Sequence, residues 1–196
     1  MPRTSAAAYD AGRVPLLIAD ALLVDAMAQA VLDHDTAPHL FRNGAPEVSA
    51  FWIDPDTGVQ CKARFDYLPD APANGGRLIV PDLKSAVSAD PSEFARAAAR
   101  YGYLLQQVHY TKALQVLGVH SDPAFLFCVV EKEAPHLVNV GQFTTEADLL
   151  LSAAALDKAL RLYRDCLAAD HWPGWTGVTD LSLPTWALYQ LEDIAS

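Results

Sequence analysis

GRLIVPDLK, residues 76–84, is an apolar segment that ends in a proline, followed by an aspartate and a lysine two positions apart. Residues 77–83 have the composition of a β-strand, and Pro81 stands near its end, where a missing N–H is tolerated. Successive side chains of a strand alternate between its faces, so Asp82 and Lys84 point to the same side. The segment therefore predicts a buried strand that presents one acid and one base together at the edge of a sheet.

The rest of the chain places this strand within a pattern of strands and helices. The turn residues DPDTG, 54–58, predict a hairpin between the segments on either side of them. In chain order we expect a helix at 16–34, strands at 47–53, 59–68 and 77–83, a helix at 90–118, strands at 124–132 and 136–143, a helix at 144–172 and an irregular tail. The order α-β-β-β-α-β-β-α predicts a single α/β domain over residues 1–196, with a mixed central β-sheet flanked by helices.

The charge of the chain restricts the classes of partner. There are 14 Lys and Arg residues against 24 Asp and Glu residues, which gives a formal net charge of −10. A protein that binds nucleic acid without specificity usually carries a basic surface, so this balance argues against that class. It leaves room for a local basic groove on an otherwise acidic protein.

Cysteine usage and the N-terminal residues indicate a cytoplasmic protein. Cys61, Cys128 and Cys166 form no C-x-x-C pair, so a zinc site or an iron–sulfur cluster is not expected, and reduced thiols fit best. The first residues, MPRTSAAAYDAG, lack the apolar core of a signal peptide, and the apolar runs are shorter than the roughly 20 residues that a membrane span requires. We therefore expect no membrane association.

Three charged side chains are expected to converge at the end of the 77–83 strand. Asp66 lies near the end of the preceding predicted strand, and if the two strands pair, Asp66, Asp82 and Lys84 meet at one edge of the sheet. Two carboxylates with open water positions form the oxygen-rich type of site that Mg²⁺ or Mn²⁺ prefers. A nearby ammonium can orient metal-activated water for attack on a phosphodiester. Glu47, at the start of the first strand, is a candidate third carboxylate.

The predicted helix 90–118 adds polar side chains to this region. Gln106 and Tyr110 are four positions apart and share a helical face. A glutamine can hold a nucleophilic water or a base edge, and a tyrosine can contact phosphate or stack on a base. Arg96 and Arg100 are also one turn apart, which is compatible with a substrate path and equally with a solvated helix face. Arg64 shares the face of Asp66 and can contact either a phosphate or a carboxylate.

The combination of these segments resembles a known group of enzymes. Glu47, KARFD at 62–66, PDLK at 81–84 and QQVHY at 106–110 together resemble the PD-(D/E)XK nuclease superfamily. More narrowly, they are similar to its exodeoxyribonuclease VIII (RecE-like) branch of phages and prophages. The resemblance covers most of residues 40–186.

The resemblance implies a restriction-endonuclease-like fold and a role for each matching residue. Asp66 and Asp82 correspond to the metal-binding acids, the Leu83 carbonyl to a further metal ligand, and Lys84 to the catalytic lysine. Glu47 corresponds to the first acidic motif of the family, and Gln106 and Tyr110 correspond to its QxxxY motif.

The activity implied by the resemblance is resection of one strand of linear double-stranded DNA. The cofactor is Mg²⁺, with Mn²⁺ as a substitute. The implied partners are linear duplex DNA, a single-strand annealing recombinase and further copies of the chain in a ring-like homo-oligomer. A ring can have a basic channel within an acidic exterior, which agrees with the net charge.

The chain departs from the family pattern at its N-terminal end. Relatives usually carry an upstream helix with a G-T-A-x-H motif, whose histidine lies at the metal site. This sequence starts too late to contain that helix, and neither His34 nor His39 has its context. The sequence leaves open whether the chain is a truncated or divergent form, or works without that ligand.

Two other classes of function remain compatible with these residues. The nuclease fold can be retained as a non-catalytic module that binds DNA or a recombination partner. A small-molecule metallohydrolase is a third interpretation, although no specific pocket motif supports it. A cleavage assay on an Asp82→Ala variant separates these classes.

Overall fold

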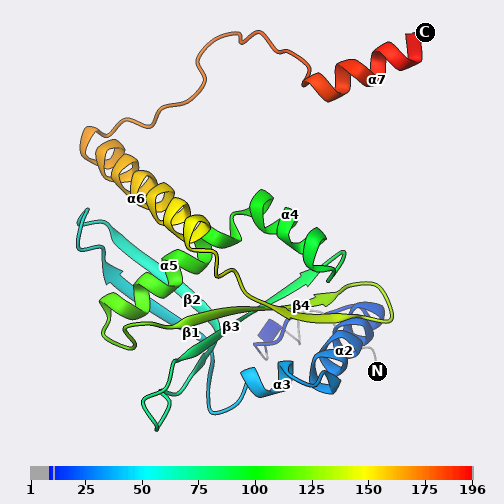
Figure 1. Ribbon diagram of the computed structural model, residues 1–196, viewed down its shortest axis with the longest axis vertical. Helices are drawn as coiled ribbons and strands as arrows, with labels where there is room; N and C mark the ends of the chain where they lie inside the picture. Colours follow the sequence, from blue (N-terminus) through cyan, green and yellow to red (C-terminus); the bar gives the residue numbers. More distant parts are fainter. Residues whose placement is uncertain (1–8, 11, 196) are drawn as a thin grey trace.

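The computed structural model describes residues 9–10 and 12–195, and its strands form two hydrogen-bonded groups (Figure 1). One group is the hairpin of β1 (Gly44–Ile53) and β2 (Gln60–Pro69). In the other, β4 (Ala124–Glu131) pairs in parallel with β3 (Ile79–Ala86) and antiparallel with β5 (Val138–Gly141). This second sheet is mixed, so the predicted α/β fold with a mixed sheet is confirmed.

The turn of this hairpin is closed by hydrogen bonds between its own backbone groups. The N–H of Asp54 donates to the carbonyl of Val59 at 2.8 Å, and Gly58 donates back to the carbonyl of Asp54 at 2.9 Å. Gly58 has a φ of 72°, a conformation that side chains disfavour, so a glycine is well suited to this position. The resulting register directs Cys61, Ala63 and Phe65 of β2 into the core.

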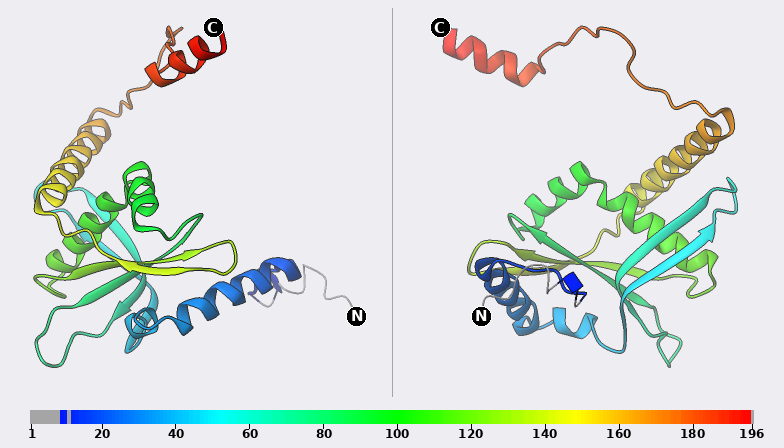
Figure 2. Two further views of the ribbon diagram at one scale, coloured as in Figure 1. Left: turned by 45° about the vertical axis from the view of Figure 1, so that its right-hand side comes forward. Right: turned by 180° about the vertical axis from the view of Figure 1, so that it is seen from behind.

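Helices cover both sides of the strands (Figure 2). Helices α4 (Pro91–Tyr101), α5 (Tyr103–Val116) and α6 (Glu146–Ala169) lie on one side, while α2 (Ile18–Asp33) and α3 (Ala37–Leu40) lie on the other. The parallel pairing of β3 and β4 requires a crossover connection, which α4 and α5 supply. This connection brings α5 across the sheets beside the end of β3.

The prediction of one continuous helix over 90–118 is wrong, because the helix breaks at Gly102. This residue has a φ of 73° in the left-handed region and ends α4, its N–H donating to the carbonyl of Ala98. A glycine adopts that conformation without steric cost, so it commonly terminates a helix. At its other end α4 is capped by Asp90, whose carboxylate accepts from the N–H groups of Ser92 and Glu93.

The main core lies between the strands and α4 and α5. It is rich in aromatic side chains, and the rings of Phe125 and Phe127 on β4 lie 5.2 Å apart, with Phe94 of α4 5.5 Å from Phe127. Phe65 and Phe127 are almost completely buried, and burial of such side chains stabilises a fold by about 1.5–3 kcal/mol each. The core therefore fixes the positions of β2, β3 and α4 relative to one another.

The C-terminal segment extends away from the strands. The α6 helix ends at Asp170 in the left-handed conformation, and residues 171–184 lead to α7 (Thr185–Ala195), which lies far from the sheets (Figures 1 and 2). The expectation of a wholly irregular tail is wrong at α7, where a run of good helix formers follows Pro184. Within the described residues, no helix is both long enough and apolar enough to cross a membrane.

Candidate active site

Asp82 and Lys84 lie together on β3, as their spacing predicts. The side chain of Asp82 is almost completely buried, and the ammonium of Lys84 forms an ion pair with its Oδ2. Only 18% of the Lys84 side chain is exposed, so this pair is partly shielded from water. The acid and the base at the end of this strand are therefore in direct contact.

Gln106 of α5 completes a closed ring of contacts with these two residues. Its amide Nε2 donates to Oδ1 of Asp82, and its Oε1 accepts from the Lys84 ammonium at 3.0 Å. Each of the three side chains contacts the other two. The α5 helix thus holds both the carboxylate and the ammonium in one orientation, and the predicted convergence of Gln106 with Asp82 and Lys84 occurs in the structure. We refer to these three residues as the site ring.

Asp66 of β2 joins the site through a bond between its side chain and the backbone of β3. Its Oδ2 accepts a hydrogen bond from the N–H of Leu83 at 2.8 Å. The two strands share no backbone ladder, so the pairing that was expected from the sequence is replaced at this point by a side chain. The expected proximity of Asp66 to Asp82 nevertheless arises, because Leu83 is the residue that follows Asp82.

The electrostatics of Asp82 differ from those of an ordinary buried ion pair. Burial, together with the nearby charge of Asp66, holds the pKa of Asp82 above its ordinary value, although Lys84 and Gln106 act in the opposite direction. In addition, Oδ2 of Asp82 is buried and lacks a hydrogen bond with good geometry among the described residues, despite its ion pair with Lys84. The site therefore keeps negative charge that its own contacts do not fully compensate.

Glu47 stands opposite Asp66 in the hairpin, at the one position where the ladder is interrupted. Pro46 pairs with Tyr67 and Val48 with Phe65, so the register places Glu47 across from Asp66. Glu47 has a φ of 56°, an unusual conformation for a residue other than glycine, and such strain is typically found at functional positions.

The carboxylate of Glu47 is engaged by an arginine of the neighbouring strand. Its Oε2 lies 3.0 Å from Nε of Arg64, and both side chains are largely exposed. Of the two contacts that the sequence leaves open for Arg64, the structure thus contains the one to a carboxylate. A role of Glu47 as a metal ligand stays a prediction.

Tyr110 lies one turn beyond Gln106 but has different neighbours. Its hydroxyl accepts a hydrogen bond from the N–H of Arg64 at 3.4 Å, and its ring packs 5.1 Å from that of Phe65. It therefore contacts β2 and the core, and it makes no hydrogen bond to the site ring among the described residues.

The oxygen atoms at this site fit a hard divalent cation. No group of three or more acidic, histidine or cysteine side chains in the described part of the chain is arranged to hold a metal. Mg²⁺, however, keeps several waters and needs only one or two carboxylates. The incompletely bonded Oδ2 of Asp82 and the mutual repulsion of Asp82 and Asp66 are what such a cation relieves. Asp66, Asp82 and the carbonyl of Leu83 are the groups that would hold it.

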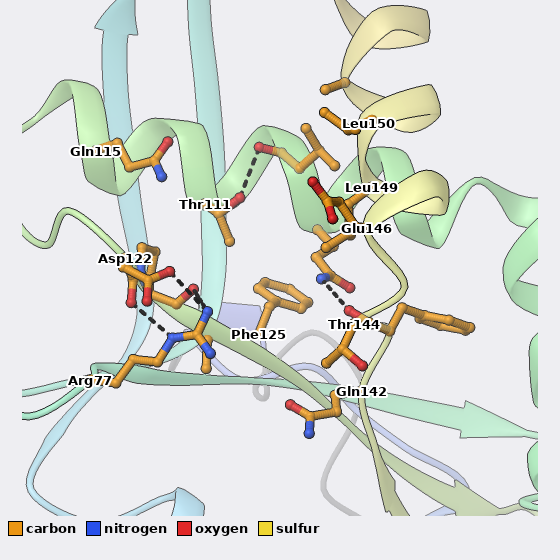
Figure 3. Close-up of a pocket in the computed structure, with 16 residues that line it drawn as sticks. Arg77, Thr111, Gln115, Asp122, Phe125, Gln142, Thr144, Glu146, Leu149 and Leu150 are labelled. Carbon is orange, nitrogen blue, oxygen red and sulfur yellow. Dashed lines mark hydrogen bonds and ion pairs between the residues drawn. The ribbon is translucent and has the colours of Figure 1, made fainter.

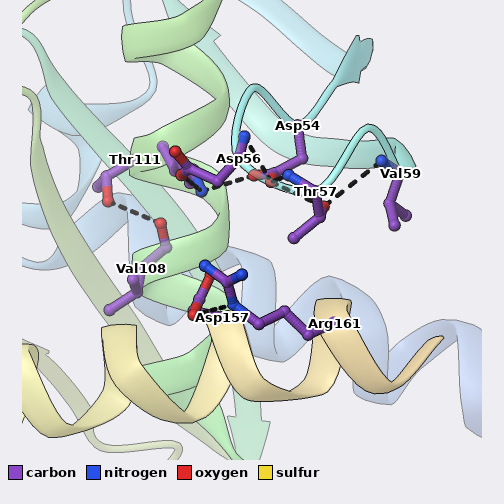
Figure 4. A network of polar contacts seen from close by, with 9 residues as sticks. Asp54, Asp56, Thr57, Val59, Val108, Thr111, Asp157 and Arg161 are labelled. Carbon is purple, nitrogen blue, oxygen red and sulfur yellow. Dashed lines mark hydrogen bonds and ion pairs between the residues drawn. The ribbon is translucent and has the colours of Figure 1, made fainter. Parts of the chain in front are cut away.

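Two sets of contacts made by α5 were missed in the sequence, one at the site and one at the far end of the helix. The first is a cation–π contact between Lys84 and Tyr103, in which the ammonium lies over the ring, 4.8 Å from its centre. The second is a partly buried network at the hairpin turn, where Lys112 of α5 forms ion pairs with Asp54 and Asp56. Figure 4 shows Asp54, Asp56 and Thr57 of this turn. The turn residues themselves were a clear signal, but nothing in the sequence pattern pointed to their partner on α5.

A separate cavity of about 530 Å³ lies between α5, the start of β4 and α6 (Figure 3). Gln107, which follows Gln106 on α5, donates from its Nε2 to the carbonyl of Phe143 at 3.0 Å in this cavity, and Arg77 pairs with Asp122 at 2.9 Å. No residue of the site ring lines it. Adjacent glutamines of α5 therefore face two different environments.

A solved structure shares this fold. The crystal structure of a "Putative exonuclease" from Eubacterium rectale matches with a TM-score of 0.56 at 10% sequence identity, covering 88% of this chain and 66% of that one. At this identity the likeness shows the fold alone. The crystal structure of SSO0001 matches with 16% identity over 72% of this chain and 59% of that one, but its TM-score of 0.38 is too low to support an argument.

Sequence comparison identifies the family. No curated protein matches the chain. A family profile matches residues 10–182, a range that contains every residue of the site described above. The chain therefore belongs to the family described as "PDDEXK-like domain of unknown function (DUF3799)".

Proposed function

We propose that the chain is a metal-dependent deoxyribonuclease that degrades linear double-stranded DNA from an end. The observation that carries this proposal is the site ring of Asp82, Lys84 and Gln106 beside the second carboxylate of Asp66. Acid, base and amide come from two different elements and meet at the end of β3. Such an arrangement is characteristic of a catalytic site, where buried charge is retained at some cost in stability.

The side chains divide the chemistry of phosphodiester hydrolysis among them. Asp66 and Asp82 would hold Mg²⁺ or Mn²⁺, which would supply Lewis-acid stabilisation of the phosphate and make water a better nucleophile. Lys84 contributes a fixed positive charge that orients the attacking water and the phosphate oxygen. Gln106 holds both of these side chains in place through its two hydrogen bonds.

The choice of substrate rests on resemblance rather than on a bound ligand. The sequence motifs are similar to those of nucleases that resect linear duplexes, and the Eubacterium rectale protein of similar fold is described as an exonuclease. This chain spans 66% of the length of that protein. A ring-like homo-oligomer and an annealing recombinase as partner belong to the same proposal.

The test is a cleavage assay on linear and closed-circular duplex DNA with Mg²⁺ or Mn²⁺. The wild-type chain should degrade only the linear form, and Lys84→Ala should abolish this activity. Lys158→Ala, which removes an exposed lysine of α6, is the matched control and should cleave normally. Cutting of the circular form would indicate an endonuclease instead.

A non-catalytic module is the second candidate function, and one observation favours it. Lys84 is held by both Asp82 and Gln106 within the site ring. If the folded wild-type chain cuts neither form with either metal but still binds DNA, the module is the correct interpretation and the nuclease proposal is wrong.

A further inference from the structure

A basic groove begins at Lys84 and runs along α4. It has a volume of about 620 Å³ and is formed by the end of β3, the exposed face of α4 and the loop after β4. Its cationic members are Lys84, Arg96, Arg100 and Lys132, and Glu93 is its one carboxylate. Four of the 14 lysines and arginines of a chain with net charge −10 thus line one groove. This is the local basic surface that the overall charge leaves room for.

A continuous row of side-chain contacts follows the groove from the site ring outward. The Lys84 ammonium lies 4.8 Å from the centre of the Tyr103 ring. The Tyr103 ring lies 5.9 Å from that of Tyr101, and the guanidinium of Arg100 lies 5.7 Å from the centre of the Tyr101 ring. The row therefore starts at the proposed catalytic lysine, Lys84, continues through the two aromatic rings of Tyr103 and Tyr101, and ends at the cation of Arg100.

The break at Gly102 creates this row. In a continuous helix, residues two positions apart point to different sides, so Tyr101 and Tyr103 would not be neighbours. The left-handed conformation of Gly102 turns the chain and places the two rings next to each other. A Cβ at this position would meet only Leu105, at 3.6 Å, so glycine is required for its conformation rather than for space.

The outer cations of the groove are available to a ligand. Arg96 is paired with Glu93 on the same helix. Arg100 and Lys132 form no ion pair in the described part of the chain, and both are exposed. Tyr101 is 64% exposed and presents an open ring beside them. Two uncompensated charges and an exposed aromatic ring favour an anionic ligand that also carries flat, stackable groups.

We propose that this basic groove binds single-stranded DNA and leads it to the site ring, with Arg100 and Lys132 contacting phosphates and Tyr101 stacking on a base. This proposal rests on the proposed nuclease function, because the strand is led toward the site ring at the end of the groove that Lys84 lines. The ligand is a single strand because a duplex keeps its bases stacked on one another and offers none to Tyr101. An enzyme that resects one strand of a duplex handles a single strand at its site.

The test measures binding without cleavage. A short fluorescent oligothymidylate is titrated with the full chain in EDTA, and fluorescence anisotropy is recorded over a range of NaCl concentrations. The variant Arg100→Ala with Lys132→Ala should bind at least about tenfold more weakly, and the slope of log K against log salt should fall by about 0.7 for each lost phosphate contact. Tyr101→Ala should weaken binding roughly tenfold, whereas Tyr101→Phe, which keeps the ring, should not.

The control variant removes the same number of positive charges from a surface outside the groove. Arg161→Ala with Lys158→Ala changes two cations of α6 outside the groove and should leave both affinity and salt slope nearly unchanged. Equal losses in the two double variants, or no binding by the wild-type chain, would overturn the proposal. Equal binding and equal loss with a blunt duplex would make the groove a duplex surface and overturn the single-strand assignment. Circular dichroism verifies that each variant is folded.

Failure of this inference is distinguishable from failure of the proposed function. Because binding is measured without metal, it does not depend on cleavage. An inactive wild-type chain whose groove variants lose affinity refutes the nuclease and retains the groove. An active wild-type chain whose groove variants bind normally refutes the groove and retains the nuclease.

Discussion

Two buried aspartates, each paired with a lysine, lie at opposite ends of the contact between α5 and the strands. At one end Asp82 of β3 pairs with Lys84 and with Gln106 of α5. At the other, Asp54 in the hairpin turn pairs with Lys112 of α5 (Figure 4). Asp82 is 2% exposed and Asp54 is fully buried, so burial alone does not distinguish the two pairs.

The pKa values of the two aspartates are shifted in opposite directions. Burial by itself raises the pKa of Asp54, but hydrogen bonds from Lys112 and Thr57 outweigh it and hold this pKa below its ordinary value. Its Oδ1 accepts from the N–H and the hydroxyl of Thr57 at 2.9 and 2.8 Å. For Asp82 burial raises the pKa and the like charge of Asp66 adds to it, and the contacts with Lys84 and Gln106 do not outweigh these two causes.

This difference supports the proposal that the Asp54 pair serves folding and the Asp82 pair serves chemistry. A fully bonded carboxylate stabilises the structure around it, and the Asp54 pair accordingly fastens the hairpin turn to α5. A carboxylate that is kept charged beside another carboxylate is costly unless a ligand completes it. The carboxylate of Asp54 thus has donors within its own turn, whereas that of Asp82 lies beside the like charge of Asp66, which agrees with the proposed metal site at Asp82.

The largest expected effect is on catalysis. Asp82→Asn should reduce cleavage of linear DNA by about 10³-fold or more, because it removes the charge of a proposed metal ligand without changing the shape of the side chain. Asp54→Asn should leave the rate per folded molecule within about twofold, since Asp54 belongs to the turn. Initial rates normalised to the folded fraction measure both. Equal losses in the two variants would contradict the division of roles.

The next effect is on the free energy of unfolding, where Asp54→Asn should have the larger effect and Asp82→Asn the smaller one. Asp54→Asn should lower the free energy of unfolding by about 3 kcal/mol, because it leaves Lys112 without its buried partner. Asp82→Asn should change it by less than about 1 kcal/mol, since it also removes repulsion with Asp66. Urea denaturation followed by tryptophan fluorescence gives both values. A larger loss for Asp82→Asn would show that its ion pair is structural.

The site ring was largely predictable from the sequence because its signals are local. The i, i+2 spacing of Asp82 and Lys84 on an apolar strand fixes their common face wherever the strand lies. To predict that Asp66 and Gln106 join them, the correct order of strands and helices and the resemblance to a family were also needed. Their arrival at one point follows from packing that no local pattern contains.

The parts that could not be predicted depend on backbone conformation or on distant contacts. Gly102 lies within good helix formers, and its left-handed φ became visible only in the structure. The row of Tyr101 and Tyr103 follows from that φ and was missed with it. Lys112 meets Asp56 across 56 positions of sequence, a pairing that neither residue's own context indicates. The strained φ of Glu47 likewise arises from the interruption of a ladder.

A smaller effect is expected from the two glutamines of α5, which extend the comparison to neighbouring residues. Gln106→Leu should reduce the cleavage rate by about 10–100-fold with little change in substrate KM, because Asp82 and Lys84 lose the amide that orients them. Gln107→Leu should leave the rate within about twofold, since it faces the separate cavity and its Oε1 has no hydrogen-bond partner among the described residues. Steady-state kinetics on linear DNA measure both variants, and equal rates would exclude a positioning role for Gln106.

The smallest effect concerns the contribution of Asp54, in the hairpin turn, to the stability of the protein in acid. A carboxylate whose pKa is lowered by folding contributes stability above its unfolded pKa, and this contribution is lost as the pH falls through the folded pKa. For Asp54 the loss should occur below about pH 4. The difference in free energy of unfolding between wild type and Asp54→Asn should therefore be constant near neutral pH and shrink in acid. Urea denaturation at a series of pH values measures it.

Other titratable groups lie around Asp54 and its partner Lys112. Lys112 and Asp56 contact it or its partner, and the charges of Cys61 and His109 are also influenced by it. Burial keeps the pKa of the Cys61 thiol raised and that of His109 lowered, so neither becomes charged near neutral pH. Asp157→Asn, at an exposed ion pair on α6, is the control and should show a small difference from wild type across the series, because solvent screens an exposed pair and leaves it little effect on stability. A stability difference at Asp54 that persists unchanged in acid would mean that Lys112 and Thr57 hold the turn by shape rather than by charge, and the contrast with Asp82 would then rest on geometry alone.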